Sequence, residues 1–220
     1  FFFVTAPIFI KTVGIHISLF GQWLVLFSLY IQSTANNNNK RIYWIFIILL
    51  SSGIHFYFTI MSYLMYSIFR FDELIKNKNF FNFVKELLIP ILFLLPLMYI
   101  LGYFSVSIQN VLAYGFDHYK SNLLSLFNPV GTNLNGTVKW SLILPEIPIT
   151  HNRDESFGYL GLAGIVIFFF LIIFLLKNIK KINFTKYRTV ILIFVIFFII
   201  ALSNKIELGD KLLFEIPLNK

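Results

Sequence analysis

Two groups of polar residues carry the side chains in this sequence that could do chemistry. One is Gly115–Asn122, and the other is His151–Glu155, which lies shortly before an apolar run that begins near Tyr159. A carboxylate at a membrane–water boundary can act as a general base in a reaction on a lipid phosphate. An anionic carrier attracts cations, so Lys120 and Arg153 are the predicted phosphate contacts. The candidate substrate-binding residues are therefore Asp117, His118, Tyr119, Lys120, Arg153 and Glu155, and the alternative is that these are solvated loop residues.

His55 is a further candidate, because it lies inside an apolar stretch. Its imidazole is either a neutral group hydrogen-bonded to a neighbouring helix or a proton or ligand site. No pair of the four histidines has metal-ligand spacing and the chain has no cysteine, so the sequence predicts no metal site. It also lacks a Gly-rich phosphate loop and the common hydrolase motifs. No cofactor is evident, and a divalent cation has no support from the sequence.

The composition indicates where such residues would be held. The chain is 58% hydrophobic and 13% charged, and its mean hydropathy is +0.78. Soluble proteins carry about 25% charged residues. This chain therefore has too few charged side chains to cover the surface of a soluble domain, and we predict that it lies in a lipid bilayer. The net charge of +8 comes from short clusters between apolar runs. This distribution favours the anionic inner leaflet and argues against nucleic acid as a partner.

A spanning helix needs about 20 mostly apolar residues. The predicted spans are residues 15–33, 86–106, 159–177 and 188–203, together with a broken or re-entrant pair in residues 41–70. As one helix, residues 41–70 would be about 45 Å long. Two short helices that return to one face, with a break at Ser51–Gly53, are therefore favoured over a single tilted crossing. Pro90 is expected in the first turn of its span, and Pro96 is expected to kink it.

Positive charge sets the predicted orientation, because cytoplasmic links are rich in Lys and Arg. The links Lys177–Arg188 and Arg70–Lys85 are basic and therefore cytoplasmic, which places the long loop 107–157 outside. Its apolar run Leu123–Phe127 is expected to dock on the helices, because exposing it to water would be costly. The predicted fold is an all-α, polytopic transmembrane bundle with one long extracytoplasmic loop, expected to be a fragment of a longer protein.

Several segments together resemble a known family. They are His16–Trp23, Gly102–Phe104, Gly115–Gly131, Leu144–Pro148, Glu155–Leu162 and Ala201–Leu218. In this order they resemble an uncharacterised bacterial family of multi-spanning membrane proteins, the domain of unknown function sixty-three-eleven. That family is similar in layout to the GT-C superfamily of membrane glycosyltransferases.

The resemblance implies a GT-C-like enzyme of the inner membrane that moves a sugar from a polyprenyl-phosphate carrier to an acceptor outside the cell. In GT-C enzymes the catalytic acid normally lies soon after the first span. Here that region is expected upstream of Phe1, so no catalytic residue can be assigned. Two alternatives from other classes remain open: a transporter or flippase of lipid-linked glycans, and a non-catalytic subunit of an envelope-assembly complex.

Overall fold

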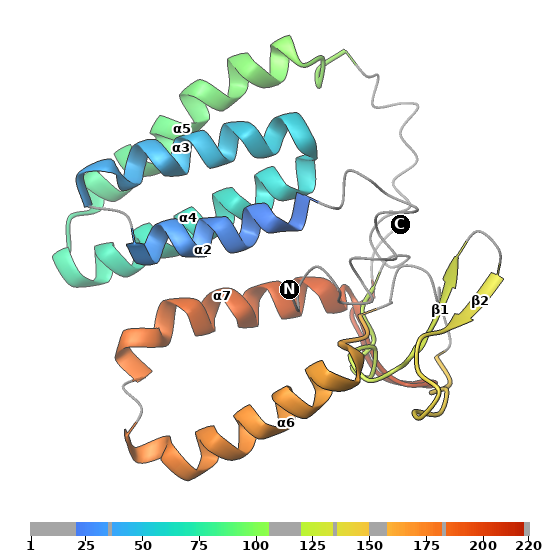
Figure 1. The fold of residues 1–220 in the computed structure, drawn as a ribbon. Helices are drawn as coiled ribbons and strands as arrows, with labels where there is room; N and C mark the ends of the chain where they lie inside the picture. The colour runs from blue at the N-terminus through green and yellow to red at the C-terminus, as the bar shows by residue number, and fades with distance from the viewer. Residues whose placement is uncertain are drawn as a thin grey trace. The chain divides into compact units, whose positions relative to one another are not determined.

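The computed structural model describes residues 21–34, 37–105, 120–133, 136–149, 158–181 and 184–217. The chain divides into two compact units, the first within residues 16–112 and the second comprising residues 1–15 and 113–220. Figure 1 shows a group of helices in the first unit, and a helix pair with short strands in the second. We refer to them as the helical unit and the capped unit.

The described residues of the helical unit form four helices, and neighbours along the chain run antiparallel. They are α2 (Trp23–Thr34), α3 (Asn37–Ile54), α4 (Phe56–Asn77) and α5 (Phe80–Ile100). Near the start of α3, Trp44 donates a hydrogen bond to Gln32 at the end of α2, with 3.0 Å between Nε1 and Oε1. The same indole packs against Tyr66 in the middle of α4 at 5.6 Å between ring centroids. Antiparallel packing thus brings charged residues that are far apart in the sequence to the same end of the helical unit.

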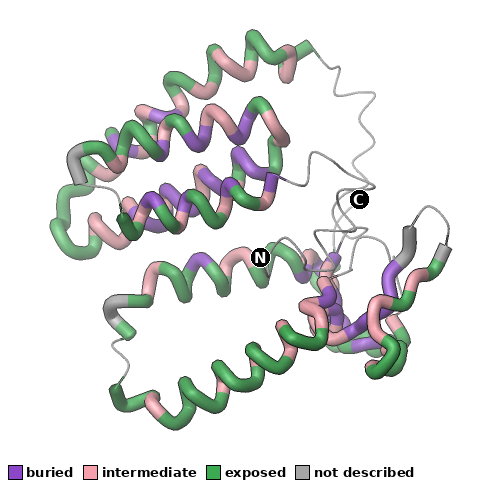
Figure 2. The backbone as a smooth tube through the Cα atoms, viewed as in Figure 1, coloured by how far each residue is buried: buried purple, intermediate pink, exposed green. Residues whose placement is uncertain are grey.

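The core of this unit lies between α3 and α4 (Figure 2). Trp44, Ile47, Met65 and Tyr66 are fully buried there. The serine hydroxyls of the two helices also meet, with 3.2 Å between the Oγ atoms of Ser51 and Ser62. Small residues of this kind let helix backbones approach closely, which explains why a polar pair lies inside an apolar bundle.

The stretch that was predicted as a broken pair forms two helices, and the break lies at His55. The predicted break at Ser51–Gly53 is wrong, because these residues continue α3. His55 has extended backbone angles, and its side chain caps α4. Both helices extend into the polar residues on either side of the predicted stretch 41–70. Helix α3 is therefore about 27 Å long and α4 about 33 Å long at 1.5 Å per residue.

Helix α5 begins and ends earlier than the predicted span 86–106. Asn79 caps its first turn by accepting a hydrogen bond from the backbone N–H of Asn82, a common role for asparagine. The chain leaves the helix at Gly102, whose φ of +81° suits glycine. Because α5 starts at Phe80, Pro90 lies in the helix interior with Pro96. The prediction that Pro90 occupies the first turn is therefore wrong.

The described residues of the capped unit form two α-helices, one short 3₁₀ helix and two β-hairpins. Its elements are α6 (Gly161–Asn178), the short 3₁₀ helix η3 (Ile179–Lys181), α7 (Phe184–Leu202), β1 (Val130–Asn133), β2 (Gly136–Lys139), β3 (Lys205–Leu208) and β4 (Lys211–Glu215). Strand β1 pairs antiparallel with β2, and β3 with β4. The chain is thus mostly helical as predicted, but the all-α prediction missed both hairpins.

Two of the described helices are long and apolar enough to cross a membrane: Phe80–Ile100 and Gly161–Lys181. A buried core helix of a soluble protein can also be this apolar, but these helices are mostly exposed. Only 11% and 6% of their most apolar windows are buried, respectively, and exposed residues line α6 in Figure 2. Their surfaces suit contact with lipid, which indicates membrane association.

Candidate functional site

The structure describes one of the six predicted substrate-binding residues, Lys120. The other five lie outside the described residues: Asp117, His118, Tyr119, Arg153 and Glu155. The segments that follow them in the chain are described, beginning at Lys120 and at Gly158. The first belongs to an assembly at one end of the α6–α7 pair, and the second leads from that assembly into α6. We call the described residues of this assembly, 120–133, 136–149 and 203–217, the cap.

Lys120 forms a buried ion pair in the cap. Its Nζ lies 2.7 Å from Oε1 of Glu207 in β3, and the two side chains are only 6% and 8% exposed. Burying two charges is costly unless they are paired and hydrogen-bonded. The pair therefore fixes the start of the cap to β3. The predicted contact of Lys120 with a phosphate remains a prediction, and the structure shows this ion pair as an additional role.

Asn122 joins the same segment to the turn of the β3–β4 hairpin. Its Nδ2 donates to the carbonyl of Gly209 at 2.9 Å, and its Oδ1 accepts from the N–H of Gly209 at 3.0 Å. Gly209 has a φ of +64°, and a Cβ there would lie 3.2 Å from the carbonyl oxygen of Pro148. A glycine is therefore needed where three segments of the cap meet.

The cap is also joined directly to the ends of α6 and α7. The N–H of Ser121 donates to the carbonyl of Ala201 in α7 at 2.7 Å, and the N–H of Leu160, just before α6, donates to Leu126 at 3.1 Å. The ring of Phe127 packs on Phe168 of α6, with 6.0 Å between centroids. Docking of the run Leu123–Phe127 on a helix is thus confirmed for Phe127.

His55 has a structural role at the turn between α3 and α4. Its Nδ1 accepts a hydrogen bond from the N–H of Tyr57 at 3.2 Å, and its ring stacks on Tyr57 at 5.0 Å between centroids. Both contacts lie on α4 itself, so the described residues show no side-chain hydrogen bond from His55 to a neighbouring helix. The alternative of a proton or ligand site stays a prediction.

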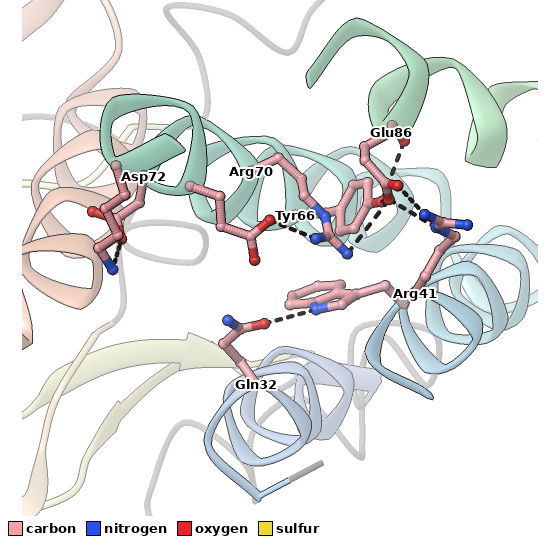
Figure 3. Close-up of polar contacts among 9 residues, drawn as sticks. Gln32, Arg41, Tyr66, Arg70, Asp72 and Glu86 are labelled. Atoms are coloured by element: carbon pink, nitrogen blue, oxygen red, sulfur yellow. Dashed lines mark hydrogen bonds and ion pairs between the residues drawn. The ribbon is translucent and has the colours of Figure 1, made fainter. Parts of the chain in front are cut away.

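A group of charged residues that the sequence analysis did not single out lies at the other end of the helical unit (Figure 3). At its centre is the carboxylate of Glu86, whose side chain is 3% exposed. Arg41 of α3 forms a two-point contact with it, through Nε at 2.9 Å and through Nη2. From α4, Nη2 of Arg70 lies 3.5 Å away, and the Tyr66 hydroxyl donates to Oε2 at 3.0 Å.

Pro90 explains why Glu86 can bind α4 twice. In a regular helix the carbonyl of residue 86 accepts from the N–H of residue 90, and proline has no N–H. The Tyr66 hydroxyl also lies 3.2 Å from this carbonyl, in position to donate to it. The helix-interrupting proline therefore creates an acceptor that a tyrosine from the neighbouring helix can satisfy, and Glu86 joins three helices.

Arg70 extends this group toward solvent. Its Nη1 lies 2.6 Å from Oε2 of Glu73, one turn later in α4, and its guanidinium lies over the ring of Tyr66 at 4.9 Å. We call these five residues, Arg41, Tyr66, Arg70, Glu73 and Glu86, the charge cluster. Its two arginines balance its two carboxylates, and the described residues contain no group of three His, Cys, Asp or Glu that could hold a metal ion.

The family assignment covers the whole chain. The family model for the domain of unknown function DUF6311 matches residues 1–220. The chain belongs to this family. No curated protein and no solved structure matches it. Membership of DUF6311 confirms the resemblance inferred from the ordered segments, whereas the similarity to GT-C glycosyltransferases remains a hypothesis.

Proposed function

We propose that this DUF6311 chain is part of a GT-C-like glycosyltransferase that spans the bacterial inner membrane several times. It would act on a sugar linked to polyprenyl phosphate, at the extracytoplasmic face. The observation that carries the proposal is the cap. It joins the segments next to both predicted substrate-binding groups to the ends of α6 and α7. A reaction on a membrane-bound carrier requires polar groups fixed at such a boundary.

The distribution of charge supports the membrane placement. Within the described part of the helical unit, residues 42–69 and 87–105 contain no Lys, Arg, Asp or Glu. The charged residues lie at one end of the four helices and include Lys40, Arg41, Arg70, Lys76, Lys78 and Lys85. In the capped unit, Lys177, Lys180 and Lys181 lie at the end of α6 that is opposite the cap. Basic ends face the cytoplasm, so the cap faces outside.

The proposed reaction uses the cap as a support for binding and orientation. The bond between the sugar C1 and the carrier phosphate breaks, a bond from C1 to an acceptor hydroxyl oxygen forms, and polyprenyl phosphate leaves. The hydroxyl proton goes to a carboxylate that acts as the general base. Arg153 would contact the phosphate, and Asp117 would orient the acceptor. Fixed orientation of two reactants contributes much of the rate in such transfers.

A carrier-release assay tests the proposal. The full-length protein is reconstituted in lipid with a sugar-labelled polyprenyl phosphate and an envelope extract as acceptor, and free polyprenyl phosphate is measured. The variants Asp117→Asn and Arg153→Gln are expected to lower the rate of release by about 10- to 100-fold, because orientation is lost. Asp210→Asn, which alters an exposed carboxylate in the β3–β4 turn, is the matched control and should keep the full rate.

Two results would contradict the proposal. Transport of the intact labelled carrier across the bilayer without release of polyprenyl phosphate would identify a flippase. Equal rates for Asp117→Asn, Arg153→Gln and Asp210→Asn, at equal membrane levels, would show that the two predicted groups take no part in transfer.

A further inference from the structure

A groove between α2 and α3 has the size and lining of a lipid-chain site. It has a volume of ≈ 600 Å³, and its walls include Phe27 and Ile31 from α2 and Ile42 and Phe46 from α3. Binding sites for small molecules usually measure about 300–1,000 Å³. The lining is mostly apolar, and the groove is open on one side. In a bilayer such a groove is filled by hydrocarbon.

Polar groups are present at only one end of this groove. Tyr30 and Thr34 line it near the end of α2, and Tyr43 lines it near the start of α3. At 1.5 Å per residue, Tyr30 lies about 6 Å from the end of its helix and Tyr43 about 9 Å from the start of its helix. Tyrosine is typical of this depth, where its ring contacts hydrocarbon and its hydroxyl reaches the lipid headgroups.

A cation lies at the same end. Lys40 precedes Tyr43 by three residues on α3, and residues with this spacing are neighbours on a helix surface. In the part of the chain that the structure describes, Lys40 has no ion pair, and the hydroxyls of Tyr30 and Tyr43 have no hydrogen-bond partner. Arg41 beside it is held by Glu86. The groove thus combines an apolar channel with one available cation and two available hydroxyls.

We propose that the groove binds an anionic phospholipid of the cytoplasmic leaflet. One acyl chain lies between α2 and α3, Lys40 contacts the phosphate, and the tyrosine hydroxyls bind oxygens of the headgroup and ester region. The proposal rests on the membrane placement and orientation argued under Proposed function, and it does not depend on sugar transfer. The charge of Lys40 selects an anionic headgroup over a zwitterionic one.

Photocrosslinking can test this site. The full-length protein is placed in nanodiscs that contain phosphatidylglycerol or phosphatidylcholine with a diazirine on one acyl chain, and labelled peptides are mapped by mass spectrometry. Phosphatidylglycerol should label residues 23–46 about fivefold more than phosphatidylcholine, since one lysine near an anionic surface contributes ~1 kcal/mol. Lys40→Gln should bring this ratio close to one.

A groove-filling variant and a matched control separate this site from general lipid contact. Ile42→Trp should fill the groove and lower labelling by both probes. Leu92→Trp is the matched control, because Leu92 lies on α5 outside the groove and is 68% exposed, compared with 64% for Ile42. This variant should leave labelling unchanged. Equal labelling by both probes in the unaltered protein, or an unchanged ratio in Lys40→Gln, would overturn the proposal. Displacement of the probe by polyprenyl phosphate but not by phosphatidylglycerol would overturn the choice of ligand.

The crosslinking and carrier-release assays together distinguish failure of the lipid site from failure of the proposed sugar transfer. Selective labelling by phosphatidylglycerol in a protein that releases no polyprenyl phosphate would support the lipid site and contradict only the proposed transfer. Normal release in a protein that shows no headgroup preference would contradict the lipid site alone.

Discussion

Glu86→Ala is expected to lower the free energy of unfolding by about 3–5 kcal/mol, the usual cost of removing one partner from a buried ion pair. Two arginines and a tyrosine from two other helices meet this carboxylate. Without it, the guanidinium of Arg70, whose side chain is 14% exposed, keeps Glu73 as its acidic partner among the described residues. Thermal unfolding of the full-length protein in detergent should show a decrease in Tm of about 10 °C.

Glu73→Ala is the matched control for this prediction. Glu73 is also an acidic partner of Arg70, but its side chain is 43% exposed and pairs within one helix turn. Exposed pairs of this kind contribute about 0.3–0.5 kcal/mol. Glu86→Gln should lose less stability than Glu86→Ala, because an amide oxygen can still accept from Tyr66. If Glu86→Ala and Glu73→Ala unfold at the same temperature, the charge cluster does not join the helices.

Lys120→Met should loosen the cap, because it removes the cation of the buried ion pair with Glu207. Removing one partner of a buried ion pair costs about 3 kcal/mol or more. Where opening of the β3–β4 hairpin limits exchange, ~3 kcal/mol corresponds to about 100-fold faster amide exchange. Hydrogen–deuterium exchange of peptides covering residues 203–217 in the full-length protein measures this effect.

The double variant Lys120→Met with Glu207→Leu tests the physical cause. Replacing a whole buried ion pair with apolar side chains is often neutral, so the double variant should recover most of the protection. Glu215→Ala serves as a control in the same hairpin, since the pair between Lys205 and Glu215 is longer, at 3.4 Å, and more exposed. Equally fast exchange in the single and double variants would mean that the pair does not hold the cap.

The sequence predicted the helices better than the contacts between them. The apolar runs indicated a helical region that overlaps each α-helix in the described residues, because length and hydropathy are local properties. Helix boundaries were less accurate. Asn79 and Gly102, a cap and a stop signal, could have placed α5 correctly and with it Pro90, which was not expected in mid-helix.

The charge cluster could not be predicted from local patterns. Arg41 and Glu86 are 45 residues apart, and their meeting depends on how α3 and α5 pack. The ion pair of the cap could not be predicted from local patterns either, because Lys120 and Glu207 are 87 residues apart in the sequence. Alternation in β3 would have placed Ile206 and Leu208 inside, yet Glu207 is the buried residue, because it meets Lys120. The Gly209–Asp210 turn was the available signal for this hairpin.

Site-directed labelling of single cysteines tests the central claim that the cap faces outside and the basic ends face the cytoplasm. The sequence contains no cysteine, so Thr137→Cys, Lys211→Cys, Lys76→Cys and Lys180→Cys each introduce one exposed thiol into this chain. In spheroplasts, an impermeant maleimide should label positions 137 and 211 at once, and positions 76 and 180 only after the membrane is permeabilised. Labelling of position 180 from outside, or protection of positions 137 and 211 until permeabilisation, would contradict this account.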